Sequence, residues 1–187
     1  TVCDIINDPE SNSGHDAIVQ TAWKGLDLIP SHVDLAGIEI DLIDEEGREN
    51  KLKEGLEEIV GKYDFILIDT PPSLSLLTVN VFTFAKEVLV PCQTHPYAYD
   101  ALAELFDTVG AVNEEINPDL NVTGIIPTFF DKRTKISNKI LNTLKTDERY
   151  KELIFNTAIR VYTTIAESTG VGKPGVFYKK SSYGACD

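Results

Sequence analysis

The chain has 187 residues, 42% of them hydrophobic and 25% charged, which is enough for one globular domain with a buried core. Its 17 basic and 30 acidic residues give a formal net charge of -13, which opposes broad electrostatic attraction to nucleic acid or to an anionic membrane. The three widely spaced cysteines fit no disulfide framework, and there is neither a signal peptide nor a membrane-spanning apolar run, so a cytoplasmic protein is expected.

The first sixty residues are expected to be mainly helical. Residues 1–25 should form a loop-rich entry with a short helix from about Asp16, and residues 26–30 alternate apolar and polar side chains up to a proline, as a short strand does. Two amphipathic helices should follow, one after possible N-caps at residues 31–34 and one over residues 48–61. Their inward-facing residues are predicted to be Leu35, Ile38, Leu42, Ile43, Leu52, Leu56, Ile59 and Val60.

A short apolar run over residues 63–69 ends in Asp69 and is followed by Thr70, Pro71 and Pro72. This pattern predicts a buried parallel strand that delivers one carboxylate to its C-terminal edge, where ligands bind in open α/β sheets. The two prolines restrict φ and stiffen the loop that leaves the strand. Such a carboxylate suits a nucleotide triphosphatase, because it can hold a water of a phosphate-bound Mg²⁺. The alternative is that Asp69 merely caps the next element.

The remainder of the chain alternates helices with strands. Periodicity predicts helices over residues 78–85, 98–116 and 136–149 and strands over residues 87–91, 121–128 and 153–159, with residues 170–187 forming a loop and a partial strand. This alternation predicts a single α/β domain over residues 1–187, with a doubly wound, mostly parallel sheet flanked by helices. The scattered His15, His32 and His95 have no partners at ligand spacing, so a metal site built by the protein alone is not expected.

Several segments resemble, in order, the ParA family of DNA-partition ATPases, within the ParA/MinD group of P-loop proteins with a deviant Walker A motif. Residues 25–31 and 34–39 are similar to the family's segment before its central helix, and residues 63–73 to its Walker B and switch stretch. Residues 90–102, 124–133 and 159–174 continue the series over nearly the whole chain. The resemblance implies a P-loop NTPase fold that binds ATP and Mg²⁺.

The resemblance also implies roles for the residues around Asp69. Asp69 would be catalytic and would hold the metal indirectly, by orienting a water bound to Mg²⁺. Thr70, Pro71 and Pro72 would form the switch loop near the γ-phosphate.

Further roles fall near two later strand ends. Thr128, Phe129, Asp131 and Arg133 would contact the nucleotide or the second subunit, and Arg160 would contact the nucleotide or DNA. The structural alternatives are core cover for the aromatic pair, a solvated turn for residues 131–133, and a surface ion pair for Arg160.

The family's phosphate loop would lie before Thr1, and its C-terminal helix would follow Asp187. Because the sequence also lacks methionine, it is expected to be the interior of a longer protein, and the 187 residues alone are expected to be inactive. Gly170-Val-Gly-Lys173 superficially resembles a phosphate loop, but it follows a predicted helix, lacks Ser or Thr after the lysine and precedes Pro174. It is therefore not expected to cradle phosphate.

The first functional hypothesis is an ATP-dependent dimerisation switch in plasmid or chromosome partition. Family members form homodimers around ATP and Mg²⁺, bind DNA without sequence preference, and respond to a ParB-like partner, so a nucleoid-associated protein without a membrane partner is expected. The alternatives are a non-enzymatic binding module that keeps the sheet and the dimer surface, and a MinD-like membrane-associated positioning ATPase.

Overall fold

The computed structural model describes residues 1–71 and 73–187, which divide into two compact units. The first unit comprises residues 1–86 and 108–120, and the second comprises residues 87–107 and 121–187. Each unit has a hydrophobic cluster of its own. The prediction that residues 1–187 form a single α/β domain stays a prediction.

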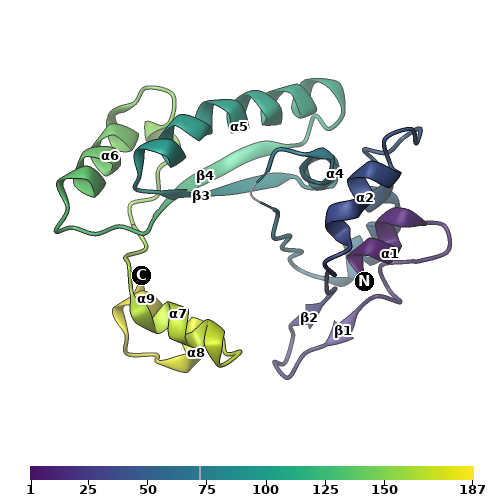
Figure 1. Ribbon diagram of the computed structural model, residues 1–187, viewed down its shortest axis with the longest axis horizontal. Coiled ribbons are helices and arrows are strands. Elements are labelled where there is room, and N and C mark those ends of the chain that lie inside the picture. Colours follow the sequence, from purple (N-terminus) through teal and green to yellow (C-terminus); the bar gives the residue numbers. More distant parts are fainter. Residues whose placement is uncertain (72) are drawn as a thin grey trace. The chain divides into compact units, whose positions relative to one another are not determined.

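Short helices build the first unit (Figure 1). They are α1 (Val2–Asn7), α2 (Leu35–Asp41), α3 (Lys51–Leu56), which continues as the 3₁₀ helix η1 (Glu57–Lys62), and α4 (Leu76–Phe84). The buried residues of its core are Cys3, Ile5, Ile6, Ile38, Leu42, Leu52, Leu56, Ile59 and Leu77. These include five of the eight residues predicted to face inward, whereas Ile43 and Val60 are exposed.

Two close contacts hold α3 against its neighbours. A Cβ at Gly55 would lie 2.1 Å from Cγ2 of Ile5, so only glycine allows α1 to approach α3 this closely. On the other side, the buried Asn80 of α4 accepts a 3.1 Å hydrogen bond from the Leu52 amide and donates a 2.8 Å bond to the Arg48 carbonyl. Because both ends of this buried amide are satisfied, it fixes α4 without a desolvation penalty.

The prediction for residues 1–30 was partly wrong. The helix lies at residues 2–7 rather than near Asp16, and residues 19–20 instead form β1 (Val19–Gln20). This strand pairs antiparallel with β2 (Asp27–Leu28), which confirms the centre of the strand predicted over residues 26–30. Apolar residues at 17–19 suit either element, and the turn between the strands decides in favour of pairing.

The strand predicted over residues 63–69 is not formed among the described residues. The segment has no strand partner, and its side chains alternate between partly buried Ile66 and Ile68 and exposed Phe65 and Leu67, which are 84% and 93% exposed. An alternation of this kind is typical of an extended chain with one covered face. The prediction of a buried strand was therefore wrong, because a strand also needs a neighbour to pair with.

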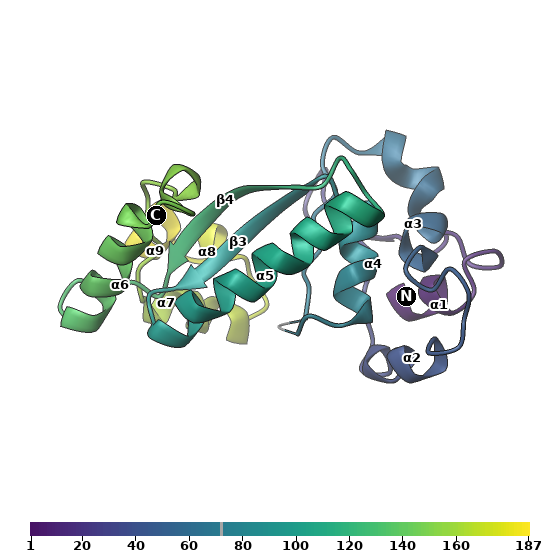
Figure 2. The same cartoon turned by 90° about the horizontal axis from the view of Figure 1, so that it is seen from above.

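The second unit contains the parallel pair β3 (Glu87–Gln93) and β4 (Asn121–Thr128). Between them runs α5 (Pro96–Glu115), whose first half covers one face of the pair, as Figure 2 shows. Helix α6 (Lys135–Thr146) and the short 3₁₀ helix η2 (Lys151–Leu153) follow β4. The buried residues of this core are Val90, Cys92, Leu102, Ile125, Ile140, Leu144 and Tyr150. The α/β class is confirmed by this helix-covered parallel pair.

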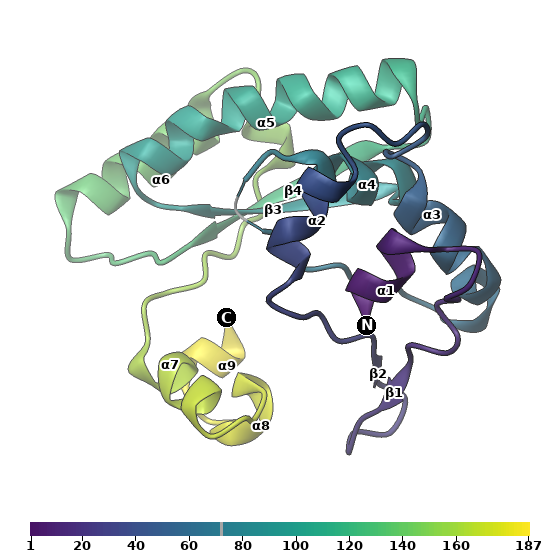
Figure 3. The ribbon, with the colours of Figure 1, turned by 45° about the vertical axis from the view of Figure 1, so that its right-hand side comes forward.

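The chain after η2 differs from the prediction. Residues 153–159 form no strand but only isolated parallel bridges, Ile125 with Ile154 and Phe130 with Arg160. The tail is helical, with α7 (Thr163–Gly170), α8 (Gly175–Tyr178) and α9 (Tyr183–Cys186) lying together (Figure 3). The loop and partial strand predicted for residues 170–187 were therefore wrong.

Candidate functional site

A pocket of about 200 Å³ lies at the carboxyl ends of β3 and β4. Because the strands are parallel, both deliver their following loops to the same end, which is where open α/β sheets bind ligands. The pocket is lined by Gln93, Thr94, His95, Phe129, Asp131, Thr134, Ile136 and Ser137.

The buried hydroxyl groups at the base of this pocket are already hydrogen-bonded. Thr94 and Ser137 bond each other through their hydroxyls, and Thr94 also donates to the Phe129 carbonyl at 3.2 Å. The Asp131 amide donates to the Ser137 hydroxyl at 3.1 Å. Phe129 has a φ of 50°, which is uncommon for a residue other than glycine and turns its side chain out of the strand. The local backbone is therefore fixed by side chains from β3, β4 and α6.

Asp131 and Arg133 form a bidentate ion pair at the edge of the pocket. The Arg133 Nε and Nη2 atoms donate to the two carboxylate oxygens at 2.9 and 2.8 Å, and the Arg133 amide donates at 2.9 Å. These hydrogen bonds from Arg133 lower the pKa of Asp131 to about 2. Asp131 therefore stays ionised at neutral pH and its charge is matched locally by Arg133.

Arg160 lies at the same end of β4, beside Phe130, through a parallel bridge. Its guanidinium is paired with Asp187, whose carboxylate also accepts a 3.2 Å bond from the Arg160 amide. Hydrogen bonding to Arg160 lowers the pKa of Asp187. The ion pair that the sequence left open as an alternative for Arg160 is therefore formed.

Asp69, Thr70 and Pro71 are exposed at the end of the extended segment of the first unit. Within residues 1–71 and 73–187, no hydrogen bond or ion pair holds the Asp69 carboxylate. It is thus free to meet a ligand, and it does not cap α4, which begins at Leu76. The predicted switch residue Pro72 lies outside the described residues.

Residues 170–173 end a helix, as expected. Gly172, with a φ of 63°, reverses the chain after α7, and the Lys173 amide donates to the Ser168 carbonyl at 3.0 Å. This is a helix C-terminal turn, in which the amide faces the helix rather than a ligand. In the described part of the chain, no cluster of His, Cys, Asp and Glu could hold a metal ion by itself.

Sequence reasoning found part of the pocket. Of the predicted nucleotide or dimer contacts, the structure brings Phe129 and Asp131 to the pocket, with Arg133 paired to Asp131 beside it and Thr128 at the end of β4. It missed the side chains that β3 and α6 contribute, chiefly Thr94 and Ser137. The available signal was that β3 and β4 run parallel, so that the residues just after each strand must meet.

A helix-covered parallel strand pair with a pocket at its carboxyl ends places the chain in the class of α/β ligand-binding proteins. A sequence profile described as "AAA domain" matches residues 1–122, about two thirds of the chain. The chain belongs to this family, in its ParA/MinD-type group of partition ATPases.

Individual relatives agree with this assignment. The chain is 36% identical over 170 residues to the sporulation initiation inhibitor protein Soj of Bacillus subtilis, covering 91% of this chain and 66% of that protein. It is 34% identical over 164 residues to the chromosome partitioning protein ParA of Myxococcus xanthus, covering 88% of this chain and 57% of ParA. The chain therefore spans somewhat over half the length of these relatives.

A solved structure supports the P-loop NTPase-like fold. The cobyrinic acid a,c-diamide synthase of Mycobacterium smegmatis, with a bound ATP analogue and magnesium, superposes with a TM-score of 0.76 at 31% identity, covering 92% of this chain and 74% of that one. Among the described residues, no helix is long and apolar enough to cross a membrane.

Proposed function

We propose that this chain is part of an ATP hydrolase that acts as an ATP-dependent dimerisation switch in plasmid or chromosome partition. The observation that carries the proposal is the exposed, unpaired Asp69 at the end of an extended segment, in a chain that belongs to the partition ATPases. A carboxylate in this position is available to a metal-bound water without first breaking an internal contact.

The chain's own residues fit the edge of a Mg²⁺–nucleotide site. Asp69 would orient a water of the bound magnesium, whose charge offsets that of the phosphates, and Thr70, Pro71 and Pro72 would restrict how the segment meets the terminal phosphate. At the β3–β4 end, Thr128, Phe129, Asp131 and Arg133 contact the nucleotide or the second subunit. Arg160 contacts the nucleotide or DNA in the same scheme.

The partners in this proposal are a second copy of the chain, a ParB-like stimulating protein, and DNA bound without sequence preference in the ATP state. The protein would then act in the cytoplasm, in association with the nucleoid. DNA binding by a chain of net charge -13 requires a local basic surface, and it should weaken steeply as salt rises.

The test is an Asp69→Asn substitution in the protein encoded by the intact reading frame. We expect ATP hydrolysis to fall by about a hundredfold or more, because positioning of the reacting water is lost. Thermal unfolding should be unchanged, since the Asp69 side chain is exposed. Asp64→Asn, an exposed carboxylate in the same segment, is the matched control. Hydrolysis at the wild-type rate by the Asp69 variant would contradict the assigned role. A wild-type protein without ATPase activity would favour the non-enzymatic module.

A further inference from the structure

The charges of this chain are unevenly divided along its length. Residues 1–120 contain six basic and 24 acidic residues, a balance of -18, whereas residues 121–187 contain eleven basic and six acidic residues, a balance of +5. The net charge of -13 therefore hides two surfaces of opposite sign. One is on α6 and the other is beside α2.

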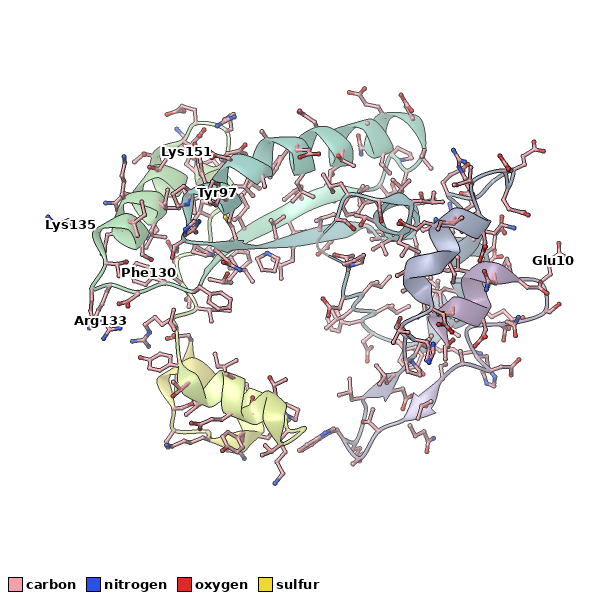
Figure 4. All side chains as sticks on the ribbon, in the orientation of Figure 1. Glu10, Tyr97, Phe130, Arg133, Lys135 and Lys151 are labelled. Carbon is pink, nitrogen blue, oxygen red and sulfur yellow. The ribbon has the colours of Figure 1, made fainter. Side chains whose placement is uncertain are left out.

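The basic surface, here called the α6 rim, consists of Lys132, Arg133, Lys135 and Lys139, all exposed. Residues 132–146 contain five basic residues and no acidic one. Figure 4 shows Arg133 and Lys135 pointing outward where the chain enters α6. The nearest carboxylate, Asp131, is already matched by Arg133, so the other cations of the rim keep their charge uncompensated by it.

The pocket opens beside this rim and suits an apolar side chain. Phe129 and Ile136, which line it, are 63% and 46% exposed. The Thr94 and Ser137 hydroxyls at its base are satisfied by each other and by the backbone, so a polar occupant would gain little there. A volume of about 200 Å³ has room for one large aliphatic side chain. The partner should therefore carry an exposed apolar residue among carboxylates.

The chain itself presents such a segment, here called the α2 strip, over residues 39–46. Ile40 and Ile43 are 71% and 55% exposed, and the segment contains five acidic residues and no basic one. Two of the acids are engaged, because Glu39 accepts from the Leu77 amide at 3.2 Å and Glu45 lies 3.5 Å from Lys51. Arg48 donates to the Ile43 carbonyl. The remaining carboxylates, Asp41, Asp44 and Glu46, are exposed.

We propose that the α2 strip of one copy docks on the α6 rim of a second copy, with Ile40 or Ile43 entering the pocket. Carboxylates on either side of the isoleucines then face Lys132, Lys135 and Lys139. The contact joins two different surfaces, so it is heterologous and builds an open chain or a closed ring of copies. It needs no nucleotide, and it therefore goes beyond the proposed ATP-dependent function.

Salt should affect this contact in two opposing ways. At low ionic strength the net charge of -13 repels one copy from another over long distances. At about 0.1 M salt the Debye length is about 10 Å, which screens this repulsion but leaves close pairs attractive, whereas at 1 M it is about 3 Å and the pairs are screened too. Association should therefore be strongest near 0.1 M salt.

The experiment reverses each surface and then mixes the variants. One variant carries Lys132→Glu, Lys135→Glu and Lys139→Glu, and the other carries Asp41→Lys, Asp44→Lys and Glu46→Lys. Sedimentation velocity of residues 1–187 without nucleotide, at about 0.1 M salt, should show wild-type self-association weakened at least about tenfold in either variant alone. Mixing the two should restore it, because each now offers the complement of the other.

Matched controls separate this contact from general charge effects. Lys173→Glu with Lys179→Glu, and Glu57→Lys with Glu58→Lys, change exposed residues outside both surfaces and should leave association unchanged. Ile40→Ser with Ile43→Ser should weaken it without altering charge. A wild-type chain that stays monomeric up to about 0.5 mM would overturn the proposal. So would a mixture of folded variants that fails to associate. Neither result would bear on ATP hydrolysis by the intact protein.

Discussion

At the scale of single residues, the site is shaped by arginines that each hold an aspartate. Arg133 pairs with Asp131 two residues away, within one turn, so this pair stiffens a loop. Arg160 pairs with Asp187, 27 residues away, so this pair ties the end of the helical tail to the end of β4. An anionic ligand at Arg160 must therefore compete with the Asp187 carboxylate.

Asp187→Asn should loosen this tie. We expect hydrogen exchange at the Arg160 amide to rise about fivefold, corresponding to ~1 kcal/mol for a partly exposed pair, because that amide donates to the lost carboxylate. Asp131→Asn breaks the comparable local pair and should leave the Arg160 amide unchanged. Equal exchange in wild type and the Asp187 variant would show that the pair does not hold the tail.

At the scale of elements, a second aspartate joins α5 to the end of α6. Asp147, which follows α6, accepts a hydrogen bond from the Tyr99 hydroxyl of α5 and from the Arg149 Nη2 at 2.8 Å. Arg149 also lies 4.7 Å from the ring centre of the buried Tyr150. Hydrogen bonds from Arg149 and then Tyr99 lower the pKa of Asp147.

The Asp147 contact should make stability depend on pH. Because the folded-state pKa is lowered, the contribution is fully present above the unfolded pKa of about 3.9 and is lost as pH falls toward the folded value. Urea unfolding of Asp147→Asn should therefore show a deficit that is constant above about pH 5 and shrinks below about pH 4. Tyr99→Phe should cost ~1 kcal/mol at pH 7. Asp100→Asn, an exposed change on α5, is the control, and a pH-independent deficit at Asp147 would contradict the linkage.

The elements that sequence predicted best are those whose signal is local. Residues 98–116 and 136–149 repeat their apolar positions at helical spacing, and residues 121–128 have turn-forming residues before them, so α5, α6 and β4 appear near their expected bounds. Residues 63–69 and 153–159 have equally apolar sequences but find no continuous partner to pair with. The four-residue helices α8 and α9 have too few residues to show a period.

The candidate site divides along the same line. Phe129, Asp131 and Arg133 were found through a resemblance carried by contiguous residues. Thr94 and Ser137 were not, because they are 43 residues apart and meet only when β3, β4 and α6 are packed. Which acid an arginine holds is also settled by folding, as the distant Asp187 shows for Arg160.

At the scale of the whole molecule, the extent of the chain bears on its activity. It covers 66% and 57% of the lengths of Soj and ParA, so the activity of the whole protein is a separate matter from that of these 187 residues. The pocket at the β3–β4 end offers few free hydrogen-bonding groups for phosphate. The described residues thus hold the Asp69 side of a proposed site without a phosphate cradle.

Calorimetry with ATP and Mg²⁺ tests this point directly. We expect residues 1–187 to bind ATP with a dissociation constant above about 1 mM, because contacts to the phosphates normally supply most of the affinity. The intact protein under the same conditions is the control. Tight, stoichiometric binding by the 187 residues would show that their own side chains form a complete nucleotide site.

The extended segment that carries Phe65 and Leu67 has a consequence for handling this chain. Its backbone amides and carbonyls lack the ladder that a sheet provides, and unpaired, apolar strands of this kind recruit other strands into aggregates. Mutual repulsion of the acidic surface keeps molecules apart at neutral pH. Acidification that protonates the carboxylates removes this protection, so precipitation on lowering the pH should begin at this segment and be suppressed by placing a lysine at position 67.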